Sequence, residues 1–230
     1  MKEFLTSSVY FGVLISLMAY GIGMILKKKF KLAIFNPVLI AIVLIIAFLA
    51  VFDIDYADYN SGAKYISYLL TPATICLAVP LYEQFEVLKK NLTAVMMGIT
   101  SGVITSLCCI LALAVLFGLD HTAYVTFLPK SVTTAIGMGI SEELGGNVAI
   151  SVGVIIITGV LGNMFSGFIC KVFHITEPIA KGIGIGSASH VIGTAKALEM
   201  GEVEGAMSSL SIVVAGLMTV AGAAVFANFL

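Results

Sequence analysis

Five long stretches without a charged residue constrain this chain more than any other feature of its sequence. They cover Phe4–Leu26, Leu32–Phe52, Leu92–Leu119, Asn147–Cys170 and Ala206–Leu230. A helix needs about 20 apolar residues to cross the hydrocarbon core of a membrane, and each stretch reaches that length. Charged residues make up only 11% of the chain, whereas soluble domains carry about 25%. The sequence therefore predicts an all-α polytopic membrane protein and excludes a water-soluble domain.

Three further apolar pieces are shorter and are interrupted by proline or glycine. They are Tyr65–Tyr82, Tyr124–Ser141 and Gly182–Gly201. Unpaired backbone groups are costly in hydrocarbon, so irregular backbone persists at membrane depth only against protein or a water-filled cavity. Broken helices at that depth are typical of solute-binding segments in transporters. With these pieces the chain has seven or eight membrane segments, which include discontinuous or re-entrant helices.

The last two broken pieces look like copies of one unit, in which a broken apolar segment precedes a long helix. Ser131–Gly137 aligns with Ser187–Gly193 at an offset of 56 residues. If both pieces re-enter the membrane, their units are inverted, as in many transporters; if both pieces span it, the units are parallel. We predict a single transmembrane domain, residues 1–230, with two N-terminal helices in 1–64 and three such units at 65–119, 124–172 and 182–230.

The placement of lysine predicts how the chain is oriented. Lys27–Lys31 holds four of the twelve lysines, whereas Asp53–Lys64 holds three aspartates and one lysine. Cytoplasmic loops are enriched in lysine and arginine. We therefore expect a loop at Lys27–Lys31 on the cytoplasmic side of a bacterial plasma membrane and the N-terminus outside. Lys89 and Lys90 also fall inside if the segment before them spans the membrane.

The first candidate site lies in Leu128–Thr134. Pro129 breaks a helix interior but suits a first turn, so we expect a helix to begin here. Such a helix directs its free N–H groups and the positive end of its dipole toward an anion. The candidate ligands for the solute are Lys130, Ser131, Thr133 and Thr134. The alternative for Lys130 is that its ammonium extends to the membrane interface from a hairpin tip.

The second candidate site lies in Gly182–Gly201, where the glycines allow an unwound entry into the following helix. The candidate ligands here are Ser187, Ser189, His190 and Thr194. Imidazole titrates near physiological pH, so His190 is a candidate for binding a carboxylate or for accepting a co-transported proton. The alternative is a neutral histidine that is bonded to a neighbouring helix.

Two further residues are weaker candidates for binding the solute. Thr74 lies between Pro72 and Pro80, in a segment that a kinked structural helix explains equally well. Asn163 would either line a cavity or form a hydrogen bond between helices.

Several classes of function find no support in the sequence. It contains neither a G-x-S-x-G nor an H-E-x-x-H motif, and its four cysteines lack metal-binding spacing. We therefore expect no enzymatic activity, no cofactor and no metal. The chain contains no arginine and no basic patch suited to nucleic acid.

Several motifs of this chain resemble those of the LrgB/CidB family. They are Leu69–Thr74, Ala78–Tyr82, Leu128–Thr134, Ala188–Ala195 and Glu199–Leu210. The resemblance covers nearly the whole chain. The family is similar to the C-terminal half of the plastid glycolate/glycerate translocator, and its members are usually described as antiholin- or holin-like proteins that modulate murein hydrolases and autolysis.

This resemblance implies a function that composition and spacing do not reveal. It implies a transporter component for small monocarboxylates of the pyruvate, glycolate or glycerate type, working with a small LrgA/CidA-type membrane protein or as a homo-oligomer. A regulator of murein hydrolases that moves no solute is the alternative. One departure is Ala135, where the family pattern has proline after two threonines; its loss should relax a local kink without removing anion-binding groups.

Overall fold

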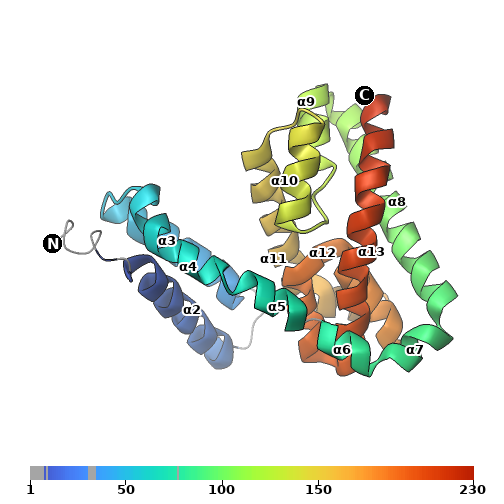
Figure 1. Cartoon of the computed structure of the whole chain (residues 1–230), viewed down its shortest axis with the longest axis horizontal. Helices are drawn as coiled ribbons and strands as arrows, with labels where there is room; N and C mark the ends of the chain where they lie inside the picture. Colours follow the sequence, from blue (N-terminus) through green and yellow to red (C-terminus); the bar gives the residue numbers. More distant parts are fainter. Residues whose placement is uncertain (1–7, 9, 31–34, 77) are drawn as a thin grey trace. The chain divides into compact units, whose positions relative to one another are not determined.

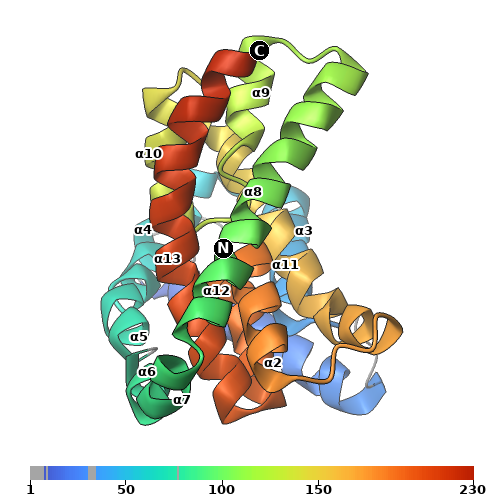
Figure 2. The same cartoon turned by 90° about the vertical axis from the view of Figure 1, so that its right-hand side faces the viewer.

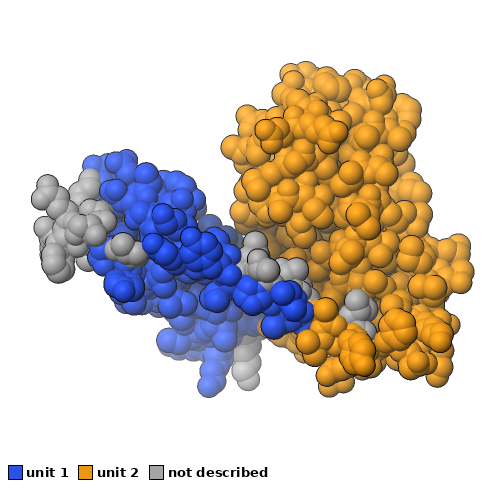
Figure 3. Space-filling model, viewed as in Figure 1, with its two compact units in different colours: residues 1–76 blue, residues 77–230 orange. Residues whose placement is uncertain are grey.

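The computed structural model describes residue 8 and residues 10–30, 35–76 and 78–230 (Figure 1). These residues form helices and connecting turns with no β-strand among them, which confirms the predicted all-α class. The chain divides into two compact units, Met1–Cys76 and Leu77–Leu230, which Figure 3 colours separately. The boundary between them falls inside the predicted unit at 65–119.

The described residues of unit 1 form four helices. They are α2 (Phe11–Phe30), α3 (Pro37–Val51), α4 (Tyr56–Ser67) and α5 (Leu70–Cys76). Asn36 begins α3, because its side-chain oxygen accepts hydrogen bonds from the amides of Val38 and Leu39 at 2.9 and 3.2 Å. Both α3 and α4 pack against α2.

Two charged segments next to the predicted spans are helical, the first of them where a loop was expected. The first is Lys27–Phe30, which forms the last turn of α2, where lysines interact favourably with the negative end of the helix dipole. The second is most of Asp53–Lys64, which forms α4. Packing explains α4: Gly12 lets the two helices approach closely, and the hydroxyls of Ser16 and Tyr59 lie 2.8 Å apart. Lys31 lies outside the described residues.

Four of the five predicted spans are confirmed as helices that are long and apolar enough to cross a membrane. They are α2, α8 (Leu92–Phe117), α11 (Val148–Val172) and α13 (Glu202–Phe226) with its 3₁₀ extension η1 (Ala227–Phe229). The fifth stretch, Leu32–Phe52, gives α3, whose 15 residues are about 22 Å long. That length is short of a core of about 30 Å. Residues 4–7 and 9 of the first stretch lie outside the described residues.

Unit 2 adds shorter helices to α8, α11 and α13. They are α6 (Ala78–Glu83), α7 (Phe85–Lys90), α9 (His121–Phe127), α10 (Thr134–Glu143) and α12 (Pro178–Met200). α8 runs the length of the unit, from the end at which α7 joins it, here called the α7 end, to the opposite α9 end (Figure 2). Its buried residues recur at every third or fourth position and pack into a core shared with α9 and α13.

α9 and α10 form a hairpin that starts and finishes at the α9 end, called here the first hairpin. Gly137 of α10 lies against Ile155 of α11, and Ser141 lies against Ser151, whose hydroxyl donates to it at 2.8 Å. From Gly137 to Ser141 along α10, the facing residues of α11 run backwards from Ile155 to Ser151, so the two helices are antiparallel. The 10-residue α10 is about 15 Å long, so it reaches only partway along the unit.

α12 is also a hairpin, because the chain reverses direction at His190. The backbone there is non-helical, with φ 43° and ψ −142°. Ile185 and Gly193 would lie about 12 Å apart in a straight helix, yet a Cβ on Gly193 would lie 3.1 Å from Ile185 Cγ2. The first arm (178–189) and the second arm (191–200) therefore lie side by side. We call α12 the second hairpin.

The two hairpins enter unit 2 from opposite ends. α9 and α10 occupy the half near the C-terminus, and α12 occupies the half near α7 in both views (Figures 1 and 2). Gly98 and Gly102 of α8 face Ile183 and Ser187 respectively, so the first arm of α12 runs parallel to α8 from the α7 end. Both hairpins therefore end near the middle of unit 2.

Candidate functional site

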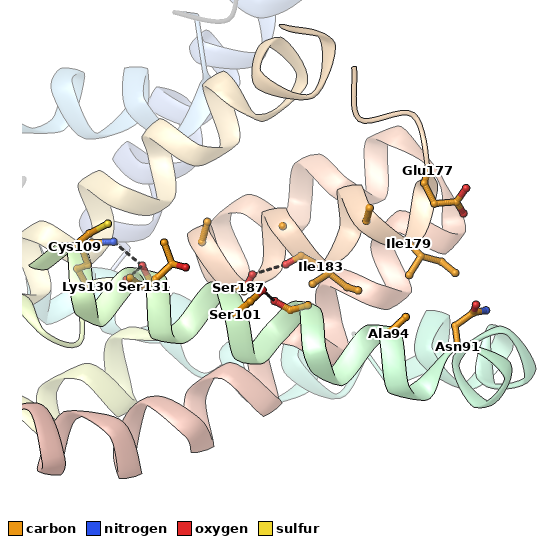
Figure 4. Close-up of a pocket in the computed structure, with 17 residues that line it drawn as sticks. Asn91, Ala94, Ser101, Cys109, Lys130, Ser131, Glu177, Ile179, Ile183 and Ser187 are labelled. Atoms are coloured by element: carbon orange, nitrogen blue, oxygen red, sulfur yellow. Dashed lines mark hydrogen bonds between the residues drawn. The ribbon is translucent and has the colours of Figure 1, made fainter. Parts of the chain in front are cut away.

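A groove of about 740 Å³ lies between α8, the break in the first hairpin and the first arm of α12 (Figure 4). It extends along α8 from Asn91 to Cys109, which corresponds to about 27 Å of helix. Near Asn91 it also reaches Glu177, which precedes α12, so the groove reaches the α7 end. Five hydroxyl side chains line it: Ser101, Thr105, Ser106, Ser131 and Ser187.

Lys130 is the only lysine among the described residues that line this groove. Its ammonium donates a hydrogen bond to Ser131 Oγ at 2.9 Å, and Ser131 Oγ lies 3.5 Å from Ser106 Oγ. Ser106 is 14 residues from the start of the 26-residue α8, so these groups lie near the middle of that helix. In the described part of the chain, Lys130 forms no ion pair with a carboxylate. The groove therefore presents an uncompensated positive charge beside hydroxyl groups.

The local sequence explains why the backbone breaks at this point. Pro129 has no amide hydrogen and cannot continue a helix past Leu128, and the chain turns until α10 begins. Thr133 caps α10 by accepting a hydrogen bond from the amide of Ile136 at 3.5 Å. Neither Thr133 nor Thr134 lines the groove, whereas Lys130 and Ser131 do.

The four candidate ligands of the second predicted site do not lie together, because only Ser187 lines the groove. Ser189 is buried against Gly162 of α11. His190 is also buried, and its Nε2 lies 3.0 Å from the carbonyl oxygen of Ile155. Thr194 donates to the His190 carbonyl at 2.9 Å, and its hydroxyl lies 2.7 Å from that of Ser208 on α13.

Of the two weaker candidates, Asn163 lies away from the groove, and the side chain of Thr74 is outside the part of the chain that the structure describes. Asn163 Nδ2 donates to the carbonyl of Ile192 at 2.7 Å, which joins α11 to the second hairpin. Thr74 belongs to α5, and its side chain is not among those that the structure describes. Among the described residues, no group of three or more His, Cys, Asp or Glu side chains could hold a metal ion.

Our sequence analysis did not identify the contribution of α8 to the groove. Small and hydroxyl residues recur along one face of this helix, at Gly98, Ser101, Gly102, Thr105 and Ser106. The same spacing occurs wherever membrane helices pack closely, so it does not by itself distinguish a packing face from a groove wall. Because the α8 segment contains no proline and no charged residue, its sequence did not indicate a site.

Comparison with known proteins places the chain in a family. Residues 16–229 match the LrgB-like family. The chain belongs to the LrgB-like family. It is 41% identical over 226 residues to proteins named "Antiholin-like protein LrgB" from Bacillus cereus (strain B4264) and Bacillus anthracis (strain CDC 684 / NRRL 3495). Each alignment covers 98% of this chain and 98% of the relative. No solved structure matches the chain.

Membership of the LrgB-like family confirms the resemblance on which the sequence analysis relied. The relatives are named for likeness to antiholins, and those names specify no solute. The chemistry of the groove in this family member therefore has to be interpreted from its own residues. An ammonium beside several hydroxyls, with which no described carboxylate forms an ion pair, suits a small anion.

Proposed function

We propose that this LrgB-like protein is a membrane carrier for small monocarboxylates of the pyruvate, glycolate or glycerate type. The observation that carries the proposal is the position of Lys130, whose ammonium reaches the inner end of the groove and pairs with no carboxylate among the described residues. A lysine at membrane depth costs about 2.5–3.5 kcal/mol on the insertion scale, so it is retained where it has a function. A bound carboxylate would neutralise it.

The arrangement of the hairpins supports an inverted repeat with two re-entrant segments. The first hairpin enters from the α9 end and the second from the α7 end, and each is followed by one long helix that crosses the unit, α11 or α13. In transporters with this plan, the solute site lies near the bilayer midplane between the repeats. Lys130 and Ser131 from one hairpin and Ser187 from the other line one groove, which supports such a site.

The charges of unit 2 support a cytoplasmic location for the α7 end. Lys89, Lys90, Lys171 and Lys181 lie at that end, whereas the α9 end has Asp120 and the two glutamates that finish α10, Glu142 and Glu143. Positively charged residues are enriched in cytoplasmic loops. The groove would then be open toward the cytoplasm. At the α9 end, Tyr124, Val125, Leu128 and Val132 are buried in the core, so that side is closed.

The solute would cross by alternating exposure of the site to the two sides of the membrane. In this cycle, the second hairpin moves against α8 and closes the cytoplasmic side of the groove. The first hairpin then moves away from α8 and opens the site to the opposite side of the membrane. A proton is a candidate coupling ion, with His190 as its candidate acceptor in a conformation that frees the ring from Ile155. In the present conformation, that hydrogen bond and the burial of the ring keep His190 out of the groove.

A protein partner would complete the membrane-facing side of the groove. Ser101, Thr105 and Cys109 line the groove and are exposed along α8. Exposed hydroxyls are poorly suited to lipid, so another helix is expected to cover them. We propose an LrgA/CidA-type small membrane protein as that partner, as the family resemblance implies, with a second copy of this chain as the alternative.

Uptake into proteoliposomes tests the carrier function. We expect wild-type protein to accumulate labelled pyruvate or glycolate, and Lys130→Met to abolish that uptake. Lys171→Met serves as the control, because Lys171 is exposed at the end of α11 and lies outside the groove. Unchanged uptake in Lys130→Met, or no uptake by wild type with and without the partner, would contradict the proposal.

The alternative function is an antiholin-like regulator of murein hydrolases that transports nothing. The names of the relatives support it. It predicts that substitutions in the groove change autolysis without changing flux, and that purified protein binds no monocarboxylate. Equilibrium binding of labelled pyruvate and glycolate to the purified protein distinguishes the two functions.

A further inference from the structure

We infer that Ser106 of α8 is a ligand of the carboxylate that Lys130 attracts, and so a residue of the binding site. This inference rests on the proposed function. Ser106 lines the groove, and its hydroxyl lies 3.5 Å from Ser131 Oγ, which in turn accepts the hydrogen bond from Lys130. Three side chains from two separate parts of the chain therefore converge at the inner end of the groove.

The hydroxyl of Ser106 is available to a ligand because the helix does not use it. Serine in an apolar helix commonly donates to the backbone carbonyl three or four residues earlier. Ser101 does so to Gly98 at 2.9 Å, and Ser187 does so to Ile183 at 2.5 Å. Among the described residues, Ser106 donates to no backbone carbonyl, and the distant Ser131 hydroxyl is its only hydrogen-bonding neighbour.

This difference gives the hydroxyls of the groove different roles. Ser187 has its proton directed at Ile183, so it presents mainly an acceptor to the groove. A carboxylate needs donors, and those beside the Lys130 ammonium are Ser131 and Ser106, while Thr105 offers a further hydroxyl to the groove one residue before Ser106. Gly102 lies one helical turn before Ser106, and a Cβ there would lie 3.2 Å from Ser187 Oγ. The absence of a side chain at Gly102 thus lets α8 and the first arm of α12 approach closely at Ser187.

Equilibrium binding of labelled glycolate and pyruvate to the full-length protein in lipid nanodiscs tests this role. We expect Ser106→Ala to raise the Kd about tenfold, as the loss of one hydrogen bond to a charged group does. Thr100→Ala is the control: it removes a hydroxyl from the same helix, but Thr100 lies outside the groove and its hydroxyl already donates to the carbonyl of Met96 at 2.7 Å. We expect the Kd of this control variant to stay within about twofold of the wild-type value.

A second variant separates a lost ligand from a damaged fold. Ser106→Thr keeps the hydroxyl, and we expect it to restore binding to within about threefold of wild type while Ser106→Ala remains weak. Equal affinity of wild type and Ser106→Ala, with Lys130→Met still unable to bind, would overturn this inference and leave the carrier proposal intact. Equal loss of affinity in Thr100→Ala and Ser106→Ala would also overturn it. Binding that survives in Lys130→Met would overturn the proposed function itself.

Discussion

Ser131 and Ser187 lie 56 positions apart in the sequence and line the same groove from two hairpins that enter unit 2 at opposite ends. Ser131 belongs to the break between α9 and α10, and Ser187 lies three residues before the reversal of α12 at His190. The offset that aligns the two segments in the sequence therefore pairs residues that converge in space. In the proposed repeat, such a pair lets both units contribute to one site.

The two serines are expected to differ in their contribution to binding. Ser131 accepts from Lys130 and keeps its own proton for a ligand, whereas Ser187 already donates to the carbonyl of Ile183. We expect Ser131→Ala to raise the Kd for glycolate about tenfold and Ser187→Ala to raise it less than threefold. Isothermal titration of the purified variants measures both values. A larger loss in Ser187→Ala would show that α12 supplies the dominant donor.

Substitution of His190 is expected to affect stability rather than affinity. Its φ of 43° lies in the region that favours glycine, and its ring is held by the carbonyl of Ile155. His190→Ala loses the hydrogen bond and keeps the strained backbone, whereas His190→Gly relieves that strain. We expect the glycine variant to be more stable than the alanine variant by about 1 kcal/mol. Thermal unfolding in detergent compares them.

The same His190 variants test its predicted part in solute binding. Because the ring is buried outside the groove, we expect His190→Gly to bind pyruvate within about twofold of wild type. A loss of tenfold or more in a variant that remains folded would support the direct role predicted from the sequence.

Much of the fold could be predicted because hydrocarbon imposes simple rules on a chain. Long uncharged stretches gave four of the spans, and Pro129 together with the hydroxyls after it located the break in the first hairpin. α4 could not be predicted in this way. Its helical state depends on packing against α2 through Gly12 and the hydroxyls of Ser16 and Tyr59, and none of these contacts is visible in hydropathy.

The candidate site was predictable in part for a similar reason. Lys130, Ser131 and Ser187 were identified because polar groups in a broken apolar segment need an explanation, and they line the groove. Ser106 was not identified, because hydroxyls are common inside unbroken membrane helices. The reversal of α12 at His190 was also hidden, since the glycines that suggested an unwound segment lie on both sides of that residue.

Gly162 is expected to be required for the second hairpin to pack on α11. A Cβ at this position would collide with the side chain of Ser189. We expect Gly162→Ala to lower the stability by about 1–3 kcal/mol, the usual cost of overpacking. Gly153→Ala on the same helix is the control, because a Cβ there meets nothing within 4 Å. In thermal unfolding, the stability of the control should equal that of wild type or exceed it by up to about 1 kcal/mol, since alanine favours a helix. Equal stability of the two variants would contradict this account of the contact.

Cys109 offers a test of the side from which the groove is reached. It lines the groove near Lys130, whereas Cys108 lies outside the groove and Cys170 is buried. In a variant that keeps only Cys109, we expect a membrane-impermeant maleimide to label the protein in inside-out vesicles and not in right-side-out ones, because the groove reaches the α7 end. Thiols react as thiolates, which form in water rather than in lipid. Saturating glycolate should protect Cys109 by filling the inner end of the groove, and a variant with only Cys108 should remain unlabelled. Labelling confined to right-side-out vesicles would contradict the proposed orientation. Labelling that saturating glycolate does not slow would show that glycolate does not bind at the inner end of this groove.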